Sequence, residues 1–374
     1  MANETSESFD RAMDGTSWNE FCDTLKAAGA VVLGENTPTD PLDRAEGFRY
    51  LSRLTRAALE SFLEYSDPLA PALNRPVHET AKIGADNPDN YYMRAAISGK
   101  HVYRLYGKRG TVNYLGFGAQ SPGVASSGDS AQAGYIEAKD MEIAPDGSFE
   151  LWLSVEPRPG NWLPLAEDSE SLIVRQTFLD RDTETPADLK IERVDGTGRP
   201  DPLTPEKLDA GLNSASGLVL GCATLFAGWA SGFEEHANEL PRFDDSVSMG
   251  AGGDPNIAYY HSYWELAPDE ALVIEAMPPE CDMWNFQLDN WWMESLDYRF
   301  HRVHTNKHIA SYEPDGAVRI VVAHEDPGLP NWIETTGHAR GTMCFRWIRA
   351  KEHPQPQTRV VEFKDLAALA SGTR

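Results

Sequence analysis

Two carboxylates that could exchange protons, Asp289 and Glu294, stand in a short stretch rich in large aromatic side chains. A carboxylate packed against aromatic walls loses its hydration, so its pKa rises toward neutrality, which suits a general acid or base. The sequence therefore indicates proton-transfer chemistry in this stretch. The alternative is a surface position, where Glu294 would pair with Arg299 or Arg302.

A nearby histidine would complete a proton-transfer pair, and most of the ten histidines lie in the second half of the chain. We select His304 and His324 as the proton-exchanging partners, and Asn331 as the group that orients a substrate oxygen. His301, His304 and His308 would share one face if they lay on a helix, but the segment leads into the turn Pro314-Asp315-Gly316 and reads as a strand. No HExxH or HxH spacing occurs, so we expect neither a metal nor a cofactor.

Large aromatic residues crowd the stretch from Tyr259 to Trp292, in greater number than one sandwich interior needs. We predict a largely apolar pocket for a hydrophobic small molecule of lipid, terpenoid or steroid size. Its proposed ligand-binding residues are Tyr260, Trp264, Trp284, Trp291 and Trp292. The alternatives are that these residues are core, since large aromatics dominate cores, or that they stack on the rings of a carbohydrate.

The elements that must position these groups alternate between helical and strand-rich segments. Apolar periodicity predicts helices in the first eighty residues and again over Pro202 to Leu240, opened by Thr204 as N-cap and Pro205. Short β-branched and aromatic runs broken by turns predict strands between and after them. We expect a helical N-terminal segment (1–84), a first β-sandwich module (85–200), a helical inter-module segment (201–250), a second β-sandwich module (251–360) and a C-terminal tail (361–374).

The two strand-rich regions repeat the same order of features, which indicates an internal duplication. Each opens with a Pro-Asp-Gly turn and an alternating strand, followed by a Glu, a Pro/Gly loop, an Asn-Trp pair and a strand Arg. The matched positions are Glu156 with Glu325, Asn161 with Asn331, Trp162 with Trp332, and Arg175 with Arg346, while Tyr91-Tyr92 matches Tyr259-Tyr260. We interpret these repeated residues as structural: the Asn caps a loop, the Trp closes a sandwich, and the Glu and Arg pair.

Several motifs resemble a bacterial family known as domain of unknown function 1214, which often accompanies the family numbered 1254. The matching segments are Asp86 to Tyr92, Arg158 to Leu163, Trp284 to Leu288, Glu294-Ser295, Asp326 to Trp332 and Thr336 to His338. The resemblance covers most of the chain from about Ala45 to Ala350. It implies jelly-roll-like β-sandwich units with a helical companion and no agreed activity. The expected fold class is therefore α+β, mostly β, with two such modules.

Charge excludes several partners. The 374 residues include 33 Lys or Arg and 58 Asp or Glu, a formal net charge of −25, so we expect no nucleic-acid binding, which needs clustered cations. No secretory signal is recognisable at the N-terminus and the four cysteines lie far apart, which favours a cytoplasmic protein with reduced thiols. We leave a homo-oligomer open.

One uncharged stretch, Leu212 to Phe233, is long enough to cross a bilayer. It holds several Ser, Thr and Asn residues, its flanks are acidic, and no basic anchor follows it. We predict a buried helix whose core face carries Leu218, Cys222, Leu225 and Trp229, with Gly217 and Gly221 admitting a neighbouring backbone.

Together these patterns predict a cofactor-independent enzyme that performs elimination, hydration, isomerisation or hydrolysis on a hydrophobic small molecule. The alternative is a non-catalytic β-sandwich protein that binds a hydrophobic ligand or a carbohydrate. Motifs for nucleotide binding, serine hydrolysis and catalytic cysteines do not occur.

The net charge generates a first testable prediction. Self-repulsion among the acidic residues should be relieved as salt shortens the Debye length from ~30 Å at 0.01 M to ~10 Å at 0.1 M. The melting temperature should therefore rise between these two sodium chloride concentrations in the absence of any ligand. If a divalent cation raised the melting temperature far more than sodium chloride of the same ionic strength, a specific cation site would be indicated, for instance at Asp244 and Asp245. A melting temperature that does not respond to salt would refute the prediction.

Overall fold

The structure, a computed structural model, describes residues 2–121, 132–250, 253–254 and 256–370. These residues form four sheets and a group of helices, a mixed α+β arrangement with more strand than helix. The helices are α1 (Ala2–Met13), α2 (Thr16–Val32), α3 (Pro41–Leu59), α4 (Pro205–Phe233), α5 (Asp245–Gly250) and α6 (Leu366–Ala370). A π-helical turn, η1 (Glu60–Glu64), follows α3, and three 3-10 turns are η2 (Ala138–Asp140), η3 (Glu234–His236) and η4 (Phe363–Asp365).

The strands of the first half form two four-stranded sheets. Their orders are β1-β7-β3-β4 and β6-β5-β2-β8, antiparallel except for the β5–β6 pair. The strands are β1 (Asn90–Ala96), β2 (Tyr103–Lys108), β3 (Tyr114–Gln120), β4 (Gln132–Glu137), β5 (Ser148–Ser154), β6 (Trp162–Pro164), β7 (Ser171–Thr177) and β8 (Asp188–Arg193).

The strands of the second half form two more sheets, with the orders β9-β15-β11-β12 and β14-β13-β10-β16. These orders match those of the first half when each first-half strand number is raised by eight, and β13–β14 is again the parallel pair. The strands are β9 (Ile257–Glu265), β10 (Glu270–Ala276), β11 (Met283–Leu288), β12 (His304–Asn306), β13 (Val318–Ala323), β14 (Trp332–Glu334), β15 (Arg340–Ile348) and β16 (Gln357–Glu362).

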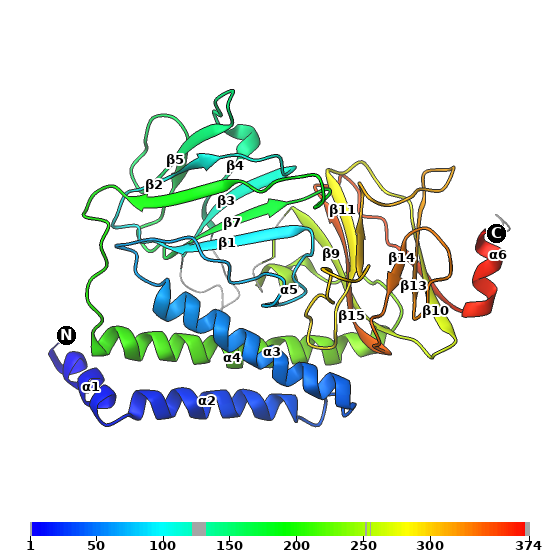
Figure 1. The fold of residues 1–374 in the computed structure, drawn as a ribbon, viewed down its shortest axis with the longest axis horizontal. Helices are drawn as coiled ribbons and strands as arrows, with labels where there is room; N and C mark the ends of the chain where they lie inside the picture. The colour runs from blue at the N-terminus through cyan, green and yellow to red at the C-terminus, as the bar shows by residue number, and fades with distance from the viewer. Residues whose placement is uncertain (1, 122–131, 251–252, 255, 371–374) are drawn as a thin grey trace.

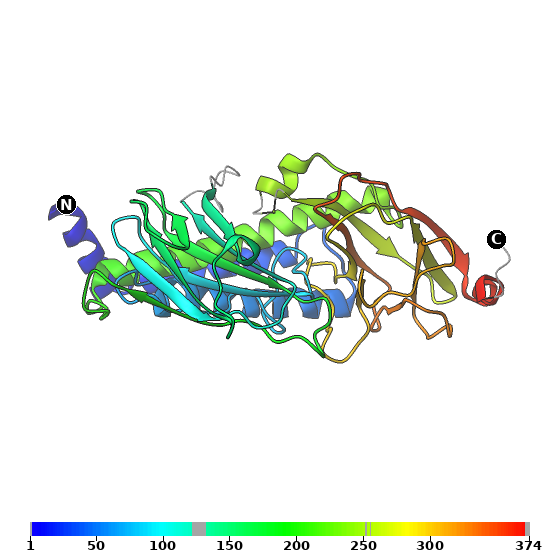
Figure 2. The same cartoon turned by 90° about the horizontal axis from the view of Figure 1, so that it is seen from above.

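Each pair of sheets shares one apolar core, which gives the sheets a sandwich-like packing. Side chains at alternate positions of a strand point to the same face, so Leu151 and Leu153 of β5 meet Leu172 and Val174 of β7 in the first core. The second core contains most of the large aromatics of β9, β11 and β15. Helices α1 to α4 lie as a layer along the long axis of the molecule, beneath the sheets in Figure 1, whereas α6 lies at the far end beside the C-terminus in both Figure 1 and Figure 2.

Helix α4 joins the two halves. The predicted N-cap is confirmed, because Thr204 Oγ1 accepts the Lys207 backbone N–H at 3.3 Å and Pro205 is the first helical residue. The predicted core face is confirmed only in part: Leu218, Cys222 and Trp229 are partly buried against the core, whereas Leu225 is 42% exposed and the positions beside Gly217 and Gly221 are open space. The face that packs on α2, α3 and β9 instead carries Leu212, Ala215, Val219, Ala223, Phe226, Ala230 and Phe233.

Within the described residues, the segment Pro205–His236 is the one helix whose length and composition would allow it to cross a membrane. Its most apolar window is 44% buried inside the protein, against α2 and α3 among others. A core helix passes the same test, so the composition of this helix is weak evidence for a membrane span.

The repeated asparagines hold equivalent loops. Asn331 Oδ1 accepts the Ser311 N–H at 2.8 Å, and its Nδ2 donates to the carbonyls of Ser311 and Arg319 at 2.7 and 2.8 Å. Asn161 makes the same three bonds with Glu142 and Glu150, at 2.7, 2.9 and 2.9 Å. Both asparagines therefore serve the backbone, as the sequence predicted.

The pairing expected between the repeated Glu and Arg residues is wrong. Glu156 and Glu325 are exposed, whereas Arg346 is buried and donates to neutral groups of another segment. The sequence also has a glycine-rich stretch, Met249 to Gly253, which predicts a break before the second set of strands; its residues Ala251 and Gly252 lie outside the described residues.

Asn331 provides a test of this loop architecture. We expect Asn331→Ala to lower the free energy of unfolding by about 2 kcal/mol, because one backbone N–H donor and two carbonyl acceptors lose their partner, and because the residue has φ 53°, which Asn tolerates better than Ala. Urea denaturation measures the change. Asn113→Ala, at an exposed position, is the control, and equal stability of the two variants would contradict the prediction.

Candidate ligand-binding site

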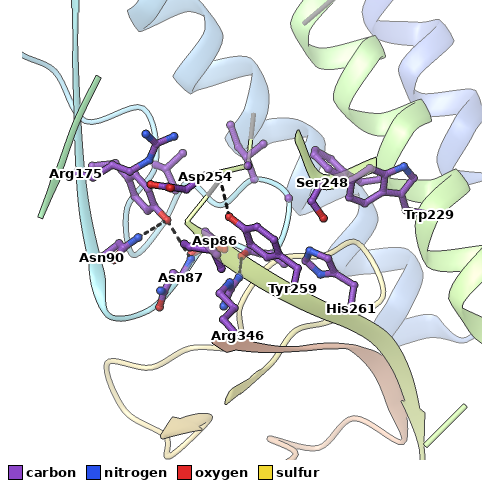
Figure 3. A pocket seen from close by; sticks show the side chains of 18 residues that line it. Asp86, Asn87, Asn90, Arg175, Trp229, Ser248, Asp254, Tyr259, His261 and Arg346 are labelled. Atoms are coloured by element: carbon purple, nitrogen blue, oxygen red, sulfur yellow. Dashed lines mark hydrogen bonds between the residues drawn. The ribbon is translucent and has the colours of Figure 1, made fainter. Parts of the chain in front are cut away.

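A cavity of about 210 Å³ lies where the two halves of the β-structure meet α4. We call it the interface cavity; Figure 3 shows its lining side chains. Its apolar wall consists of Val77, Ile83, Phe226, Trp229 and Ile257. Its polar wall consists of Asp86, Asn87, Asn90, Tyr92, Arg175, Ser248, Asp254, Tyr259, His261 and Arg346, and backbone at Gly84, Ala85 and Gly253 completes it.

His261 is one of the buried titratable groups of this wall. It alternates with Ile257 and Tyr259 on β9, so the three side chains face the same way. Its imidazole stacks on Tyr259 and Phe233, with ring centroids 5.4 and 5.9 Å apart and planes within 6°. Burial, and then the charge of Arg346, lowers the pKa of His261 to about 3. The ring is therefore neutral at physiological pH, and its Nδ1 has no hydrogen-bond partner among the described residues.

Two tyrosine hydroxyls reach the cavity from turns of the same design. The Tyr92 oxygen accepts from Asn90 Nδ2 at 2.9 Å and from the Asn87 N–H at 3.4 Å. The Tyr259 oxygen accepts from the Asp254 N–H at 3.1 Å, from a residue again five positions earlier. In both cases the phenol oxygen is an acceptor, which leaves its own O–H hydrogen to donate to a third group (Figure 3).

Each tyrosine also lies opposite an arginine. Tyr92 pairs with Arg175 across β1 and β7, and Tyr259 pairs with Arg346 across β9 and β15. Arg346 is 3% exposed, and it donates to Gln287 Oε1 at 2.6 Å and to the Ala85 carbonyl at 2.6 Å. No ion pair holds Arg346 among the residues that the structure describes, so its charge contributes a positive potential to the cavity.

The tyrosines and arginines of the cavity belong to the positions that repeat in the two halves of the sequence. A tyrosine and an arginine pair across strands in each half, so a cavity between the halves is lined by one such pair from each. The strand registers shift the match predicted from the sequence by one residue: Tyr92, and not Tyr91, is the counterpart of Tyr259. His261 belongs to the histidine-rich half, but no motif or spacing in the sequence distinguishes it from the other histidines there.

The two predicted carboxylates are buried but engaged elsewhere. Asp289 is fully buried; it accepts from Gln287 Nε2 at 2.5 Å, and its Oδ2 has no partner among the described atoms. Burial raises its pKa to about 8. The expected rise in pKa is thus present, although Asp289 does not line the interface cavity.

Glu294 is 1% exposed and forms an ion pair with Arg53 of α3 at 2.7 Å. The alternative of a surface pair with Arg299 or Arg302 is therefore wrong, and Arg299 pairs with Asp297. Burial raises the pKa of Glu294, although Arg53 opposes the rise. Glu294 also accepts from Asn290 Nδ2 at 3.0 Å, so both of its oxygens are used.

The remaining predicted catalytic residues are separated from these carboxylates. His304 Nε2 lies 3.2 Å from Asp89 Oδ1, and His324 Nδ1 lies 2.9 Å from Thr335 Oγ1. Asn331 serves its loop. No hydrogen bond within the described structure joins any two of the five residues selected from the sequence, and none of the five lines the interface cavity.

The predicted ligand-binding aromatics belong to the cores. Tyr260, Trp264 and Trp284 lie in the second sandwich core, and Trp291 and Trp292 lie where the helices pack on the second half. All five are at most 1% exposed, and none lines the interface cavity. For these five residues the structure agrees with the alternative interpretation, that they are core.

A second cavity, of about 250 Å³, lies between α3 and the loop around Ser295. Its charged groups bind one another: Glu46 bonds His338 at 2.8 Å and Arg49 at 2.7 Å, and Arg53 bonds Glu294. Lys82 donates to the backbone carbonyls of Ser295 and Leu296. Because these groups already have partners, the interface cavity is the better candidate site.

The histidines considered as metal ligands have different partners. His301 Nδ1 lies 3.0 Å from Glu334, whereas His304 faces Asp89. The described residues contain no group of three or more His, Cys, Asp or Glu side chains that could hold a metal ion. Asp245, considered as half of a cation site, pairs with Arg242 at 2.9 Å.

Comparison with known proteins gives one strong likeness. An uncharacterized protein from Burkholderia cenocepacia, whose crystal structure is solved, is 52% identical over 95% of this chain and 99% of its own, with a TM-score of 0.91. A Vibrio parahaemolyticus protein is 10% identical over 91% of this chain and all of its own, with a TM-score of 0.49, which is too low for any inference. No family model and no curated protein matches the chain. The resemblance to domain of unknown function 1214 stays a prediction.

The burial of Asp289 provides a pH-dependent test of the structure. Its folded pKa of about 8 exceeds the unfolded value of 3.8, so the native state binds more protons between these values and stability falls as pH rises through them. Asp289→Asn mimics the protonated acid. We expect it to gain about 3 kcal/mol of stability relative to the parent between pH 5 and pH 8, measured by urea unfolding. Asp188→Asn, at an exposed position, should show no such gain; a parallel pH profile for Asp289→Asn would contradict the assignment.

Proposed function

The chain belongs to the same family as this Burkholderia cenocepacia protein, and we propose that it binds a small, partly apolar molecule in the interface cavity. The observation that supports the proposal is the division of the cavity into an apolar wall and a polar wall, which includes the unpartnered Nδ1 of His261 and two tyrosine hydroxyls that act only as acceptors in the described structure. Ligand sites combine these two features, because the apolar wall supplies affinity and a few polar groups fix orientation.

The size of the cavity narrows the ligand. Sites for drug-sized molecules have volumes of about 300–1,000 Å³, and an apolar cavity of about 150 Å³ holds benzene. At about 210 Å³, the interface cavity suits one ring with a polar group better than the steroid or lipid expected from the sequence.

Binding is the proposal, and the acid–base enzyme remains a separate hypothesis. Glu294 and Asp289 do not line the cavity; Glu294 pairs with Arg53, and Asp289 accepts a hydrogen bond from Gln287. A binding role requires no acid–base pair at the site, whereas the predicted enzyme requires its proton-exchanging groups to reach one substrate.

We also propose that the two halves are jelly-roll-like modules that arose by duplication. The matching strand orders, the matching asparagine loops and the matching tyrosine turns support this origin. A site between two such modules would then have received one tyrosine and one arginine from each.

We also propose a cytoplasmic location, which the acidic composition and the four free cysteines support.

A cavity-filling variant tests the binding proposal. Ser248 of α5 lines the cavity, whereas Ser246 of the same helix is exposed and does not line it. A library of ring-sized acids, amides, alcohols and sugars is screened by thermal shift. We expect Ser248→Phe to weaken the binding of the hits at least tenfold, or ~1.4 kcal/mol, and Ser246→Phe to leave it unchanged. Hits that bind equally well to both variants would contradict the proposal, and hits confined to sugars would favour a carbohydrate site.

A further inference from the structure

We infer that the interface cavity takes an uncharged single-ring molecule whose carbonyl oxygen accepts hydrogen bonds from the tyrosine hydroxyls of the polar wall. This inference rests on the proposed binding function and adds the chemical class of the ligand. Three observations carry it: the hydroxyl hydrogens of Tyr92 and Tyr259, the presence of both signs of charge on the wall, and the apolar rings that line the cavity.

The two tyrosine hydroxyls have hydrogens to donate. Each phenol oxygen accepts a backbone N–H from five residues earlier, that of Asn87 for Tyr92 and that of Asp254 for Tyr259. Neither hydroxyl donates to another group within the described part of the chain. Burial raises the pKa of Tyr259 to about 12, so its hydroxyl keeps its hydrogen at neutral pH. The wall therefore calls for a ligand oxygen that accepts hydrogen bonds.

His261 adds a third hydrogen-bonding group without adding charge. The residue is 7% exposed, and its Nδ1 has no partner among the described residues. Its ring is held by stacking against Tyr259 and Phe233. Buried polar atoms are usually hydrogen-bonded, so a polar ligand atom would satisfy this nitrogen as well. The two hydroxyls and the imidazole, which have hydrogen-bonding capacity to spare, are all uncharged.

The charged groups of the wall have both signs: the carboxylates of Asp86 and Asp254, and the guanidinium groups of Arg175 and Arg346. Asp86 accepts the N–H and the hydroxyl of Ser295 at 3.0 and 2.9 Å, and Arg346 donates to a backbone carbonyl and a side-chain amide. A ligand anion would be repelled by the carboxylates, and a ligand cation by the guanidinium groups. Because a buried charge is costly unless it is paired, the wall favours an uncharged ligand.

The apolar wall is fixed and of ring size. Phe226 and Trp229 pack edge to face, with ring centroids 5.7 Å apart. A Cβ atom at Gly84 would lie 2.5 Å from the Phe226 ring, so the backbone there presses directly on this ring and holds it. The volume of about 210 Å³ leaves room for one ring. A ring that carries a carbonyl group therefore matches both walls.

The first part of the test compares ligands of one size that differ in charge. Benzamide, benzoate, benzylamine and phenylglycine are titrated into the full chain by calorimetry at pH 7, up to about 10 mM. We expect uncharged benzamide to bind at least tenfold more tightly than the anion, the cation or the zwitterion, because these bring buried charge. Binding of any of the three as tightly as benzamide would overturn the inference.

The second part tests the carbonyl oxygen. Acetophenone and ethylbenzene differ in having a carbonyl or a methylene group beside the ring. We expect the double variant Tyr92→Phe and Tyr259→Phe to weaken acetophenone at least fivefold and to leave ethylbenzene within twofold, because only hydroxyl donors are removed. Tyr91→Phe, next to Tyr92 on β1 but outside the cavity lining, is the control and should change neither. Equal effects on the two ligands, whether no loss or a loss of both, would overturn the inference.

The outcomes separate the ligand class from the binding function. If a charged compound bound best, or no carbonyl compound bound, the inference would fall. Library hits that still lost affinity in Ser248→Phe would then keep the proposed function. Hits that bound Ser248→Phe as tightly as the parent would overturn both.

Discussion

The loop Ala85–Asp89, which precedes β1, packs on the sheet of β11 and β15 in the second half, and its buried hydrogen bonds fix how the two halves meet. Arg346 donates to the Ala85 carbonyl, Gln287 donates to the Asp86 carbonyl at 2.9 Å, and Asn285 donates to Asn87 Oδ1 at 2.6 Å. Each of these donors comes from the sheet that contains β11 and β15. Because a buried polar group without a partner costs about 1–3 kcal/mol, this loop and this sheet stabilise each other only in one relative position.

That position creates the interface cavity. Tyr92 follows the loop directly on β1, so anchoring the loop places Tyr92 on the wall of the cavity that Tyr259 of β9 also lines. The same Arg346 that holds the loop carries the charge of the cavity wall and lies over the Tyr259 ring, 5.7 Å from its centroid. Support of the fold and the proposed recognition of a ligand would thus depend on one guanidinium.

Helix α4 closes the cavity and ties it to the helical layer. Phe226 and Trp229 reach the cavity wall, while Ala223, Ala227 and Ala230 lie in the core with α2 and α3. Phe233 stacks on His261 and keeps the imidazole in a dry, aromatic setting. A ligand in this cavity would contact both halves and the helix at once, so its binding would be sensitive to any change in their packing.

The sequence by itself determined the features that depend on neighbouring residues. Periodicity and turns identified the helical and strand-rich segments, Thr204 and Pro205 marked the start of α4, and Asn161 and Asn331 were recognised as loop caps, because these properties follow from local backbone geometry and hydrogen bonding. The aromatic crowding after Tyr259 was visible, but whether it formed a wall or a core depended on which strand faces turned inward. The choice of Asp289 and Glu294 correctly identified buried carboxylates with raised pKa values, yet their partners, Gln287 and Arg53, could not be inferred from spacing. Only the tertiary structure decided which groups gather in one place, since Tyr92, Arg175, Tyr259 and Arg346 meet across long sequence separations through the pairing of strands and the docking of one loop.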